Sequence, residues 1–117
     1  MELKNKRYEN IGIHVLSTIF TVDKGKIKIL LVKRTNEPFK DFWALPSGAL
    51  YNDELLCDGA KRELKEKTGI TGIDLDFSAV FDDIKRSELR RMIGISFIGV
   101  INVNGLELQK ETLKTSN

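Results

Sequence analysis

The stretch that decides the fold runs from Gly48 to Ile70, with the sequence GALYNDELLCDGAKRELKEKTGI. It contains no proline, and it predicts a helix from Asp53 to Thr68. Asn52 or Asp53 is suited to cap the helix start, because a short polar side chain accepts a hydrogen bond from a free N–H of the first turn. Gly69 is a natural stop, because glycine adopts the left-handed conformation without steric cost.

This predicted helix has one apolar and one acidic side. An apolar residue recurs every fourth position, at Leu56, Ala60 and Leu64. At about 100° per residue, Glu63 falls at the edge of that stripe and Glu66 lies further round the same side. A carboxylate beside a buried face is costly unless a metal ion, a lysine or an arginine compensates its charge. From these residues alone, the alternative is an ordinary solvated helix with ion pairs such as Arg62–Glu66.

The spacing of charges and glycines resembles the Nudix box of the Nudix hydrolases, G-x5-E-x7-R-E-U-x-E-E-x-G-U, where U is a bulky aliphatic residue. The matching positions are Gly48, Glu54, Arg62, Glu63, Leu64, Glu66, Gly69 and Ile70. The preceding WALPSG resembles the usual entry into the box, and the resemblance extends from Gly12 to Val103. One position departs from the pattern, because Lys67 stands where the second of two adjacent glutamates is expected.

The resemblance implies an enzyme that hydrolyses a nucleoside diphosphate linked to another moiety, using magnesium or manganese to neutralise the pyrophosphate and activate water. Magnesium favours oxygen ligands and keeps several waters. By this resemblance the metal ligands are Glu63, Glu66 and the backbone carbonyl of Gly48. Glu63 and Arg62 are the catalytic residues: Glu63 takes part in activating the water, and Arg62, paired with Glu54, orients the carboxylates. Glu54 and Gly69 have structural roles in the box.

Lys67 has two interpretations. It follows Glu63 by four residues, so the two side chains can touch, and its ammonium would then neutralise Glu63 and displace the metal ion. Alternatively, Lys67 only favours the helix C-terminus, where cations suit the macrodipole. One carboxylate is missing in either case, so we expect weakened metal binding and slower hydrolysis. Acidic residues that could replace it are Asp82, Asp83, Glu88 and Glu107, and the sequence does not choose among them.

Residues outside the box suggest further roles. Arginine side chains bind phosphate groups well. Arg34 and Arg91 are therefore the candidates for substrate binding, and Arg86 and Arg90 lie close to Arg91 in the sequence. A solvated basic loop is the alternative. On the strands, His14 is expected to be structural, and Phe42 and Trp43 are expected to pack in the core rather than to stack on a base.

The composition bounds the class of protein. A length of 117 residues predicts one domain over 1–117, with 1–10 as a loosely held arm. A net charge of +2, from 19 basic and 17 acidic residues, gives no argument for nucleic acid binding. The single cysteine, Cys57, excludes an internal disulfide framework and is expected to be a small buried hydrophobe. With neither a signal peptide nor an apolar run of about 18 residues, we expect a cytoplasmic protein without a membrane partner.

The remaining chain predicts an α/β fold. Strands are expected at Ile11–Val22, Ile27–Lys33, Phe42–Leu45, Ile73–Phe81 and Met92–Val103. The first two form a hairpin at Gly25, and the apolar run of the second suggests burial on both faces. The Nudix resemblance makes this a mixed sheet with the box helix packed on it. Nudix domains usually continue with a strand and a helix, whereas 106–117 is short and polar, so we expect a truncated C-terminal layer and a homodimer that covers the exposed sheet.

Three functions compete. Residues 32–50, VKRTNEPFKDFWALPSGAL, also resemble the subgroup of ADP-ribose pyrophosphatases and Nudix-related transcriptional regulators. The first hypothesis is therefore a magnesium-dependent pyrophosphatase whose small-molecule substrate is ADP-ribose or a related nucleotide sugar. The second is a weakly catalytic or non-catalytic ligand-sensing domain of a regulator, which Lys67 favours; no residue here forms a DNA-reading helix, so this chain alone is not expected to bind nucleic acid. The third is a remnant that serves only in assembly.

Overall fold

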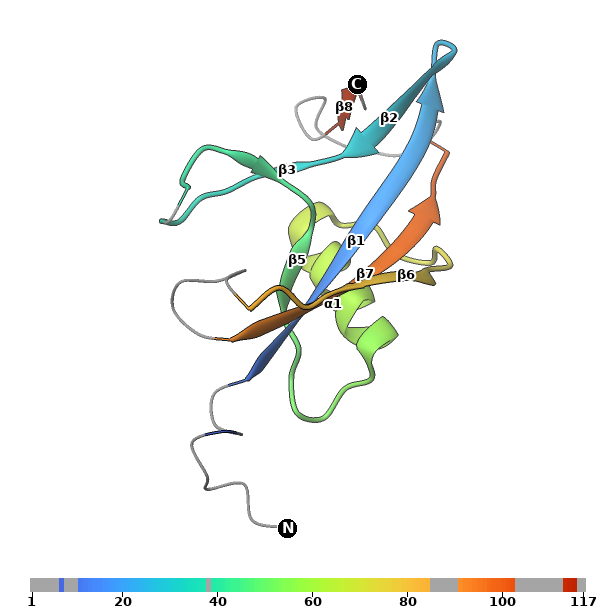
Figure 1. Cartoon of the computed structure of the whole chain (residues 1–117). Helices are drawn as coiled ribbons and strands as arrows, with labels where there is room; N and C mark the ends of the chain where they lie inside the picture. The colour runs from blue at the N-terminus through green and yellow to red at the C-terminus, as the bar shows by residue number, and fades with distance from the viewer. Residues whose placement is uncertain (1–6, 8–10, 38, 85–90, 103–112, 116–117) are drawn as a thin grey trace.

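The computed structural model describes residues 7, 11–37, 39–84, 91–102 and 113–115. In chain order its elements are β1 (Gly12–Asp23), β2 (Lys26–Leu30), β3 (Val32–Lys33), β4 (Trp43–Ala44), β5 (Ser47–Ala49), α1 (Leu56–Thr68), β6 (Asp76–Phe81), β7 (Met92–Val100) and β8 (Leu113–Thr115). The predicted α/β architecture is confirmed: a mixed sheet with one helix across a face (Figure 1).

Strand β1 is the centre of the sheet. Along one edge it pairs in parallel with β7 from Gly12 to Phe20. Along the other edge it pairs antiparallel first with β5, between His14 and Leu16, and then with β2, from Phe20 to Asp23. The main order is β6-β7-β1-β2-β8. The turn from β1 to β2 has positive φ at Lys24 (53°) and Gly25 (77°), as the hairpin prediction requires.

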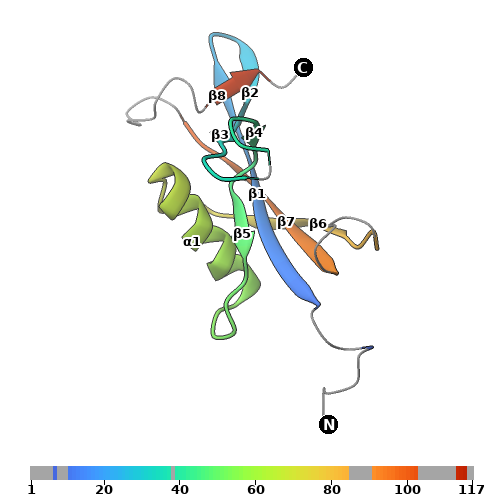
Figure 2. The same ribbon diagram turned by 90° about the vertical axis from the view of Figure 1, so that its left-hand side faces the viewer.

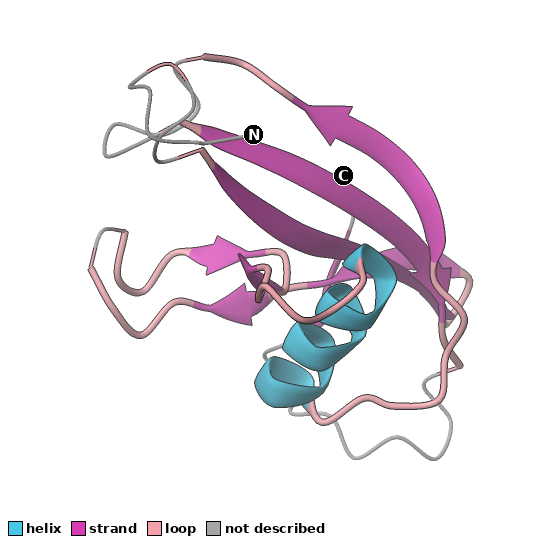
Figure 3. Ribbon diagram, turned by 90° about the horizontal axis from the view of Figure 1, so that it is seen from below, coloured by secondary structure: helices cyan, strands magenta, loops and turns pink. Residues whose placement is uncertain are grey.

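The change of partner along β1 creates a second, smaller sheet. Between β2 and β5 the chain leaves the main sheet, and β3 pairs antiparallel with β4 as a two-stranded ribbon (Figures 1 and 3). The predicted strand Ile27–Lys33 is thus divided after Leu30. Its expected burial on both faces is wrong, because Ile27 is 57% exposed. Strand β5 was not predicted, because Pro46 reads as the end of a strand.

Helix α1 lies across one face of the sheet (Figures 2 and 3). Its side chains Ala60 and Leu64 are each 1% exposed and join the core, whereas Leu56 is 38% exposed at the first turn. The core residues shared by the helix, the sheet and the connections between them are Val15, Ile19, Leu30, Ala60, Leu64, Ile70, Leu75, Ile95, Phe97 and Ile101. Ala60 and Leu64 of the predicted apolar stripe therefore form the contact surface of the helix, whereas Leu56 does not belong to the core.

The helix ends are only half as predicted. Gly69 ends the helix in the left-handed conformation, with φ 79°, and its N–H donates to the carbonyl of Lys65. The start is wrong: the helix begins at Leu56 rather than at Asp53, and no side chain caps it at Leu55. Residues 52–54 form a turn instead, in which the Glu54 carboxylate accepts a 2.9 Å hydrogen bond from the N–H of Tyr51.

The later strands are shorter than predicted. β6 begins at Asp76 rather than Ile73, and β7 ends at Val100 rather than Val103. Strand β8 pairs with β2 within 106–117, a segment for which the sequence predicted no element. The expected N-terminal arm, apart from Arg7, and most of that C-terminal segment lie outside the described residues. Of the part of the chain that is described, no helix is long and apolar enough to cross a membrane.

Candidate active site

Arg62, in the middle of α1, fastens the loop before the helix to the helix itself. Its Nε donates to Oε2 of Glu54 at 2.9 Å and its Nη2 donates to Oε1 of the same carboxylate at 2.8 Å. Nη2 also donates to the carbonyl of Ala49 at 2.9 Å. This two-pronged arrangement is the strongest geometry for an arginine and a carboxylate. Arg62 holds the Glu54 carboxylate beside the helix, which explains why residues 52–54 form a turn rather than the first turn of the helix.

The same guanidinium also reaches the two other glutamates of the box. Its Nη1 lies 2.7 Å from Oε1 of Glu63 and 3.4 Å from Oε2 of Glu66. The hydrogen bond from Arg62, with the Tyr51 N–H second, lowers the pKa of Glu54 below its ordinary 4.5. The hydrogen bonds to Glu54 and Glu63 raise the pKa of Arg62 further above its already high value. The three carboxylate groups in contact with it are therefore held in place by a permanent cation.

Tyr51 covers the face of this guanidinium, with the ring centroid 3.7 Å from Cζ of Arg62. Such a contact is attractive because the ring face is electron-rich. Sequence reasoning missed this residue. The available signal was an aromatic residue in the short loop that must pass beside the Arg62 side of the helix.

Glu63 is brought directly against Gly48. Glu63 is 7% exposed, and a Cβ atom added to Gly48 would lie 2.2 Å from the carboxyl carbon of Glu63. Gly48 is held in place because β5 pairs it with Val15 of β1. Only glycine leaves room for the carboxylate here, and the contact unites two residues that the resemblance had named as metal ligands.

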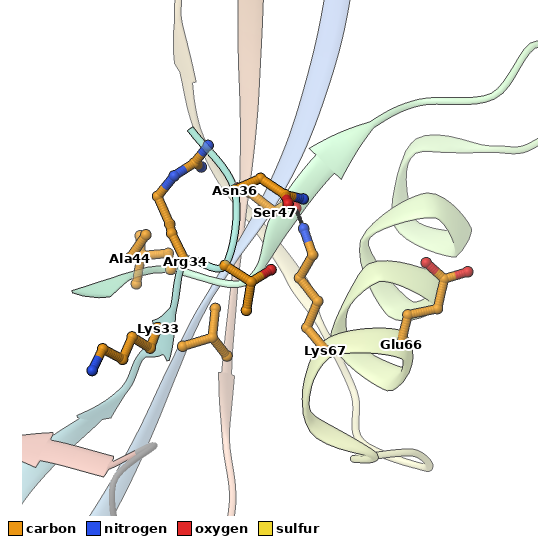
Figure 4. Close-up of a pocket in the computed structure, with 10 residues that line it drawn as sticks. Lys33, Arg34, Asn36, Ala44, Ser47, Glu66 and Lys67 are labelled. Carbon is orange, nitrogen blue, oxygen red and sulfur yellow. Dashed lines mark hydrogen bonds between the residues drawn. The ribbon is translucent and has the colours of Figure 1, made fainter. Parts of the chain in front are cut away.

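Lys67 reaches the same carboxylate from the last turn of α1. Its Nζ lies 3.2 Å from Oε2 of Glu63 and donates a hydrogen bond to the carbonyl of Ser47 (Figure 4). The first of the two interpretations of Lys67, contact with Glu63, is thus the one that the structure contains. Oε1 of Glu63 faces Arg62 and Oε2 faces Lys67, so two cations share this one carboxylate.

A pocket of about 380 Å³ opens beside Lys67, between the β3–β4 ribbon and the last turns of α1. Its lining residues are Val32, Lys33, Arg34, Thr35, Asn36, Ala44, Leu45, Ser47, Glu66 and Lys67. Figure 4 shows Lys67 crossing from the helix to Ser47, with Arg34 and Asn36 on the ribbon side. Of the two predicted substrate arginines, Arg34 lies here. Arg91 is not among the lining residues, and its Nη1 donates to the carbonyl of Asp82 at 2.6 Å.

The oxygen atoms at this site suit a hard divalent cation in kind. The carboxylates of Glu63 and Glu66 and the carbonyl of Gly48 are oxygen donors, and magnesium needs only one or two carboxylates when it keeps its waters. Lys67 competes for Glu63, so a cation fits only when that ammonium moves away. Within the described ranges, no group of three or more acidic, histidine or cysteine side chains is arranged to hold a metal ion.

The other residues named from the sequence are placed as follows. Asp82 and Asp83 lie after β6 in the exposed segment that precedes the undescribed 85–90, and they form no metal group with the box glutamates. Glu88, Glu107, Arg86 and Arg90 lie outside the described residues. His14 lies on β1 opposite Ala49. Cys57 is partly buried against the core, as expected.

The prediction that Phe42 packs in the core is wrong, since it is 62% exposed. The reason is the ribbon: β4 leaves the main sheet, so residues next to it do not meet the core. Trp43, the neighbouring residue, is partly buried.

Known proteins resemble this chain in sequence and in fold. A family model described as "NUDIX domain" matches residues 13–111. The chain is 38% identical over 93 residues to the ADPR responsive transcriptional repressor NtrR of Acinetobacter baylyi, covering 78% of this chain and 37% of that protein. It is also 38% identical over 104 residues to the ADP-ribose pyrophosphatase of Methanocaldococcus jannaschii, covering 89% of this chain and 60% of that enzyme.

The fold has solved counterparts as well. The crystal structure of a MutT/nudix family protein from Enterococcus faecalis superposes with a TM-score of 0.82 at 25% identity, over 98% of this chain and 46% of the other. This chain therefore spans between about a third and three fifths of the length of the proteins it resembles.

Proposed function

We propose, since this chain belongs to the NUDIX domain family, that it is a single Nudix domain that hydrolyses the pyrophosphate of a nucleoside diphosphate derivative. ADP-ribose or a related nucleotide sugar is the best candidate substrate, because both curated relatives are named for ADP-ribose. The observation that carries the proposal is the carboxylate of Glu63. Arg62 holds it against Gly48, and it lies 3.2 Å from Lys67, which lines the pocket together with Arg34.

Each residue of the site has a part in this reaction. Arg62, braced by Glu54 and Tyr51, fixes the direction of the Glu63 carboxylate, so that its position need not be organised at the moment of reaction. Glu63 is the general base that accepts a proton from the attacking water. Arg34 and Lys67 bind phosphate oxygens at opposite walls of the pocket. Magnesium or manganese, held by Glu63, Glu66 and the Gly48 carbonyl, would supply charge neutralisation and a more acidic water.

A second candidate function is ligand sensing without turnover. The observation in its favour is Lys67, whose ammonium lies 3.2 Å from Glu63 and so occupies one of the two oxygens that a base or a metal ligand would need. In this case the domain binds ADP-ribose and passes that signal to other parts of a longer protein, as a domain of a transcriptional regulator would. The relative named as a repressor supports this alternative.

One experiment separates the two functions. ADP-ribose is incubated with the protein in magnesium and hydrolysis is followed by chromatography, while binding is measured by calorimetry in EDTA. An enzyme gives slow, magnesium-dependent production of AMP that Glu63→Gln removes. A sensor binds ADP-ribose in EDTA and produces no AMP. A protein that neither binds nor cleaves nucleoside diphosphate derivatives contradicts both.

A homodimer is part of the proposal. Large apolar side chains are exposed on β6 and the end of β7, with Phe77 63%, Val80 51% and Val100 72% exposed. β6 is also an edge strand of the main sheet. Exposed apolar edges are usually covered by another chain, and a second copy is the partner expected from the sequence. A cytoplasmic location remains a prediction of the sequence.

A further inference from the structure

Two aromatic rings lie exposed at the end of the β3–β4 ribbon. Phe39 and Phe42 are each 62% exposed, and their ring centroids are 5.8 Å apart with planes tilted by 35°. Neither belongs to the core, because the ribbon stands apart from the main sheet. Two neighbouring phenylalanine rings in contact with water are costly to maintain unless something covers them.

The backbone fixes the position of these rings. Three hydrogen bonds close the loop: Arg34 N–H to Phe42 O at 2.8 Å, Asp41 N–H to Arg34 O at 2.9 Å, and Phe42 N–H to Phe39 O at 3.1 Å. Phe39 and Asp41 have positive φ values of 63° and 71°, which residues with a side chain rarely adopt. Backbone hydrogen bonds among the described residues of this turn therefore hold the two phenylalanines in place.

This turn adjoins the pocket that contains Arg34 and Lys67. The cross-strand pair Val32 and Ala44 lines that pocket from the ribbon. Arg34, Thr35 and Asn36, which belong to this turn, also line the pocket. Arg34 is bonded through its backbone N–H to the carbonyl of Phe42. Lys67 thus lies on the helix side of the pocket, and the turn that carries the two rings lies on its ribbon side.

We infer that Phe39 and Phe42 form the stacking site for the base of a nucleoside diphosphate whose phosphates lie toward Arg34 and Lys67. This inference rests on the proposed nucleotide function but not on hydrolysis. The ring of a nucleobase is flat and apolar on its faces, and it stacks on aromatic side chains without needing any particular hydrogen-bond pattern. The order of chemical groups, anion-binding first and aromatic second, matches a base joined through its sugar to a diphosphate.

The test compares ADP with inorganic pyrophosphate, which has the same kind of anionic group and no base. Binding of each is measured by calorimetry in EDTA to the full chain, to Phe42→Ala and Phe39→Ala, and to Phe42→Trp, which keeps a stacking surface. Ile84→Ala is the matched control, because that side chain is 75% exposed and lies after β6, outside the ribbon. Circular dichroism checks that every variant is folded.

We expect Phe42→Ala to weaken ADP binding roughly 5- to 150-fold, the range for loss of one base-stacking contact. Pyrophosphate binding should stay unchanged, Phe42→Trp should retain ADP binding, and Ile84→Ala should behave as the wild type. The fluorescence of Trp43, the sole tryptophan and the neighbour of Phe42, should change with ADP but not with pyrophosphate.

Three results would overturn the inference. One is equal weakening of ADP and pyrophosphate by Phe42→Ala, and another is no weakening of either. The third is a change in sedimentation with unchanged ADP affinity, which would assign the ring pair to contact with a second copy. If ADP binds through Phe42 but ADP-ribose is never cleaved, the stacking site stands and only the hydrolase proposal fails.

Discussion

The carboxylate of Glu63 rests on the backbone of Gly48, so close that a Cβ at Gly48 would stand 2.2 Å from the carboxyl carbon. The two residues are fifteen positions apart, yet the turn and helix between them return the chain to the same place. This contact sets the distance between α1 and β5. Glu63 on α1 and Gly48 on β5, which would hold a metal ion, therefore already lie side by side in the folded chain.

Gly48→Ala tests this contact. The added methyl group must push Glu63 away, so we expect a loss of about 1–3 kcal/mol in the free energy of unfolding, the usual cost of overpacking. Hydrolysis should fall as well, since the general base is displaced. Urea denaturation and turnover of ADP-ribose measure the two effects. Ala49→Ser, at the exposed neighbouring position, is the control, and a Gly48→Ala protein as stable and active as the wild type would contradict the close contact.

Lys67→Glu should strengthen magnesium binding. At about 4 Å two unit charges interact by roughly 4 kcal/mol at an effective dielectric of 20, and this is reduced here because the Lys67 side chain is 43% exposed. We expect a gain of roughly tenfold or more in magnesium affinity by calorimetry, with a faster pyrophosphatase rate at saturating substrate, where the loss of a phosphate-binding lysine does not limit turnover. Lys65→Glu makes the same charge change at an exposed helix position. If both variants change affinity equally, or neither does, the specific role of Lys67 is refuted.

Glu63→Gln should abolish hydrolysis. The amide keeps the shape of the side chain but has no basic oxygen and no charge for a metal ion. Turnover should therefore fall below detection, while thermal melting shows that the variant folds. Glu66→Gln, at a half-exposed position of the same helix face, should lower the rate less. Residual turnover in Glu63→Gln near the wild-type rate would remove Glu63 from the catalytic role.

Glu54→Gln should change how stability depends on pH. The hydrogen bonds from Arg62 and from the Tyr51 N–H lower the pKa of Glu54 below 4.5 in the folded chain. A group with a lowered folded pKa contributes stability above its unfolded pKa, and that contribution is lost as the pH falls through the folded value. The wild type should therefore exceed Glu54→Gln in urea midpoint at pH 7, and the difference should shrink as the pH drops below 4.5.

The control for this pH profile is Glu37→Gln, because Glu37 is an exposed acid on the ribbon. Its midpoint should follow that of the wild type at each pH. If the difference in urea midpoint between the wild type and Glu54→Gln stays constant down to the acid transition, the contact between Arg62 and Glu54 does not depend on the charge of Glu54.

Light scattering at high concentration should report a homodimer. The reason is the exposed apolar surface of β6, and Phe77→Glu should shift the protein toward the monomer by placing a charge in that surface. Phe42→Glu, on the ribbon, serves as the comparison and should leave the mass unchanged. A monomer at every concentration of the wild type would contradict the proposal.

The sequence predicted the site interactions that join residues close together in the chain. Glu54, Arg62, Glu63 and Glu66 were named because their spacing is fixed within one short segment, and the structure gathers the three glutamates around the Arg62 guanidinium. Helical spacing allowed the contact of Lys67 with Glu63 as one of two interpretations, and the structure contains that contact. Tyr51 was missed because its stacking on Arg62 depends on the path of the turn before the helix.

Strands with a strong periodicity were predicted correctly, whereas strands whose limits depend on their pairing partners were not. The strand β1 and the turn at Gly25 were predicted within one residue. The apolar run of the predicted Ile27–Lys33 strand gives no sign that the strand is divided. The division depends on β1, which pairs with β2 along one part of its length and with β5, distant in the sequence, along another. Phe42 was assigned to the core for the same reason: the aromatic character was visible, but the departure of the ribbon from the sheet was not.

The two walls of the pocket therefore differ in how they are anchored. The helix wall is fixed to the core through Ala60 and Leu64, while the ribbon wall carries Arg34 on a two-stranded sheet of its own. A change in the tilt of the ribbon widens or narrows the space in front of Lys67 without breaking a hydrogen bond of the main sheet.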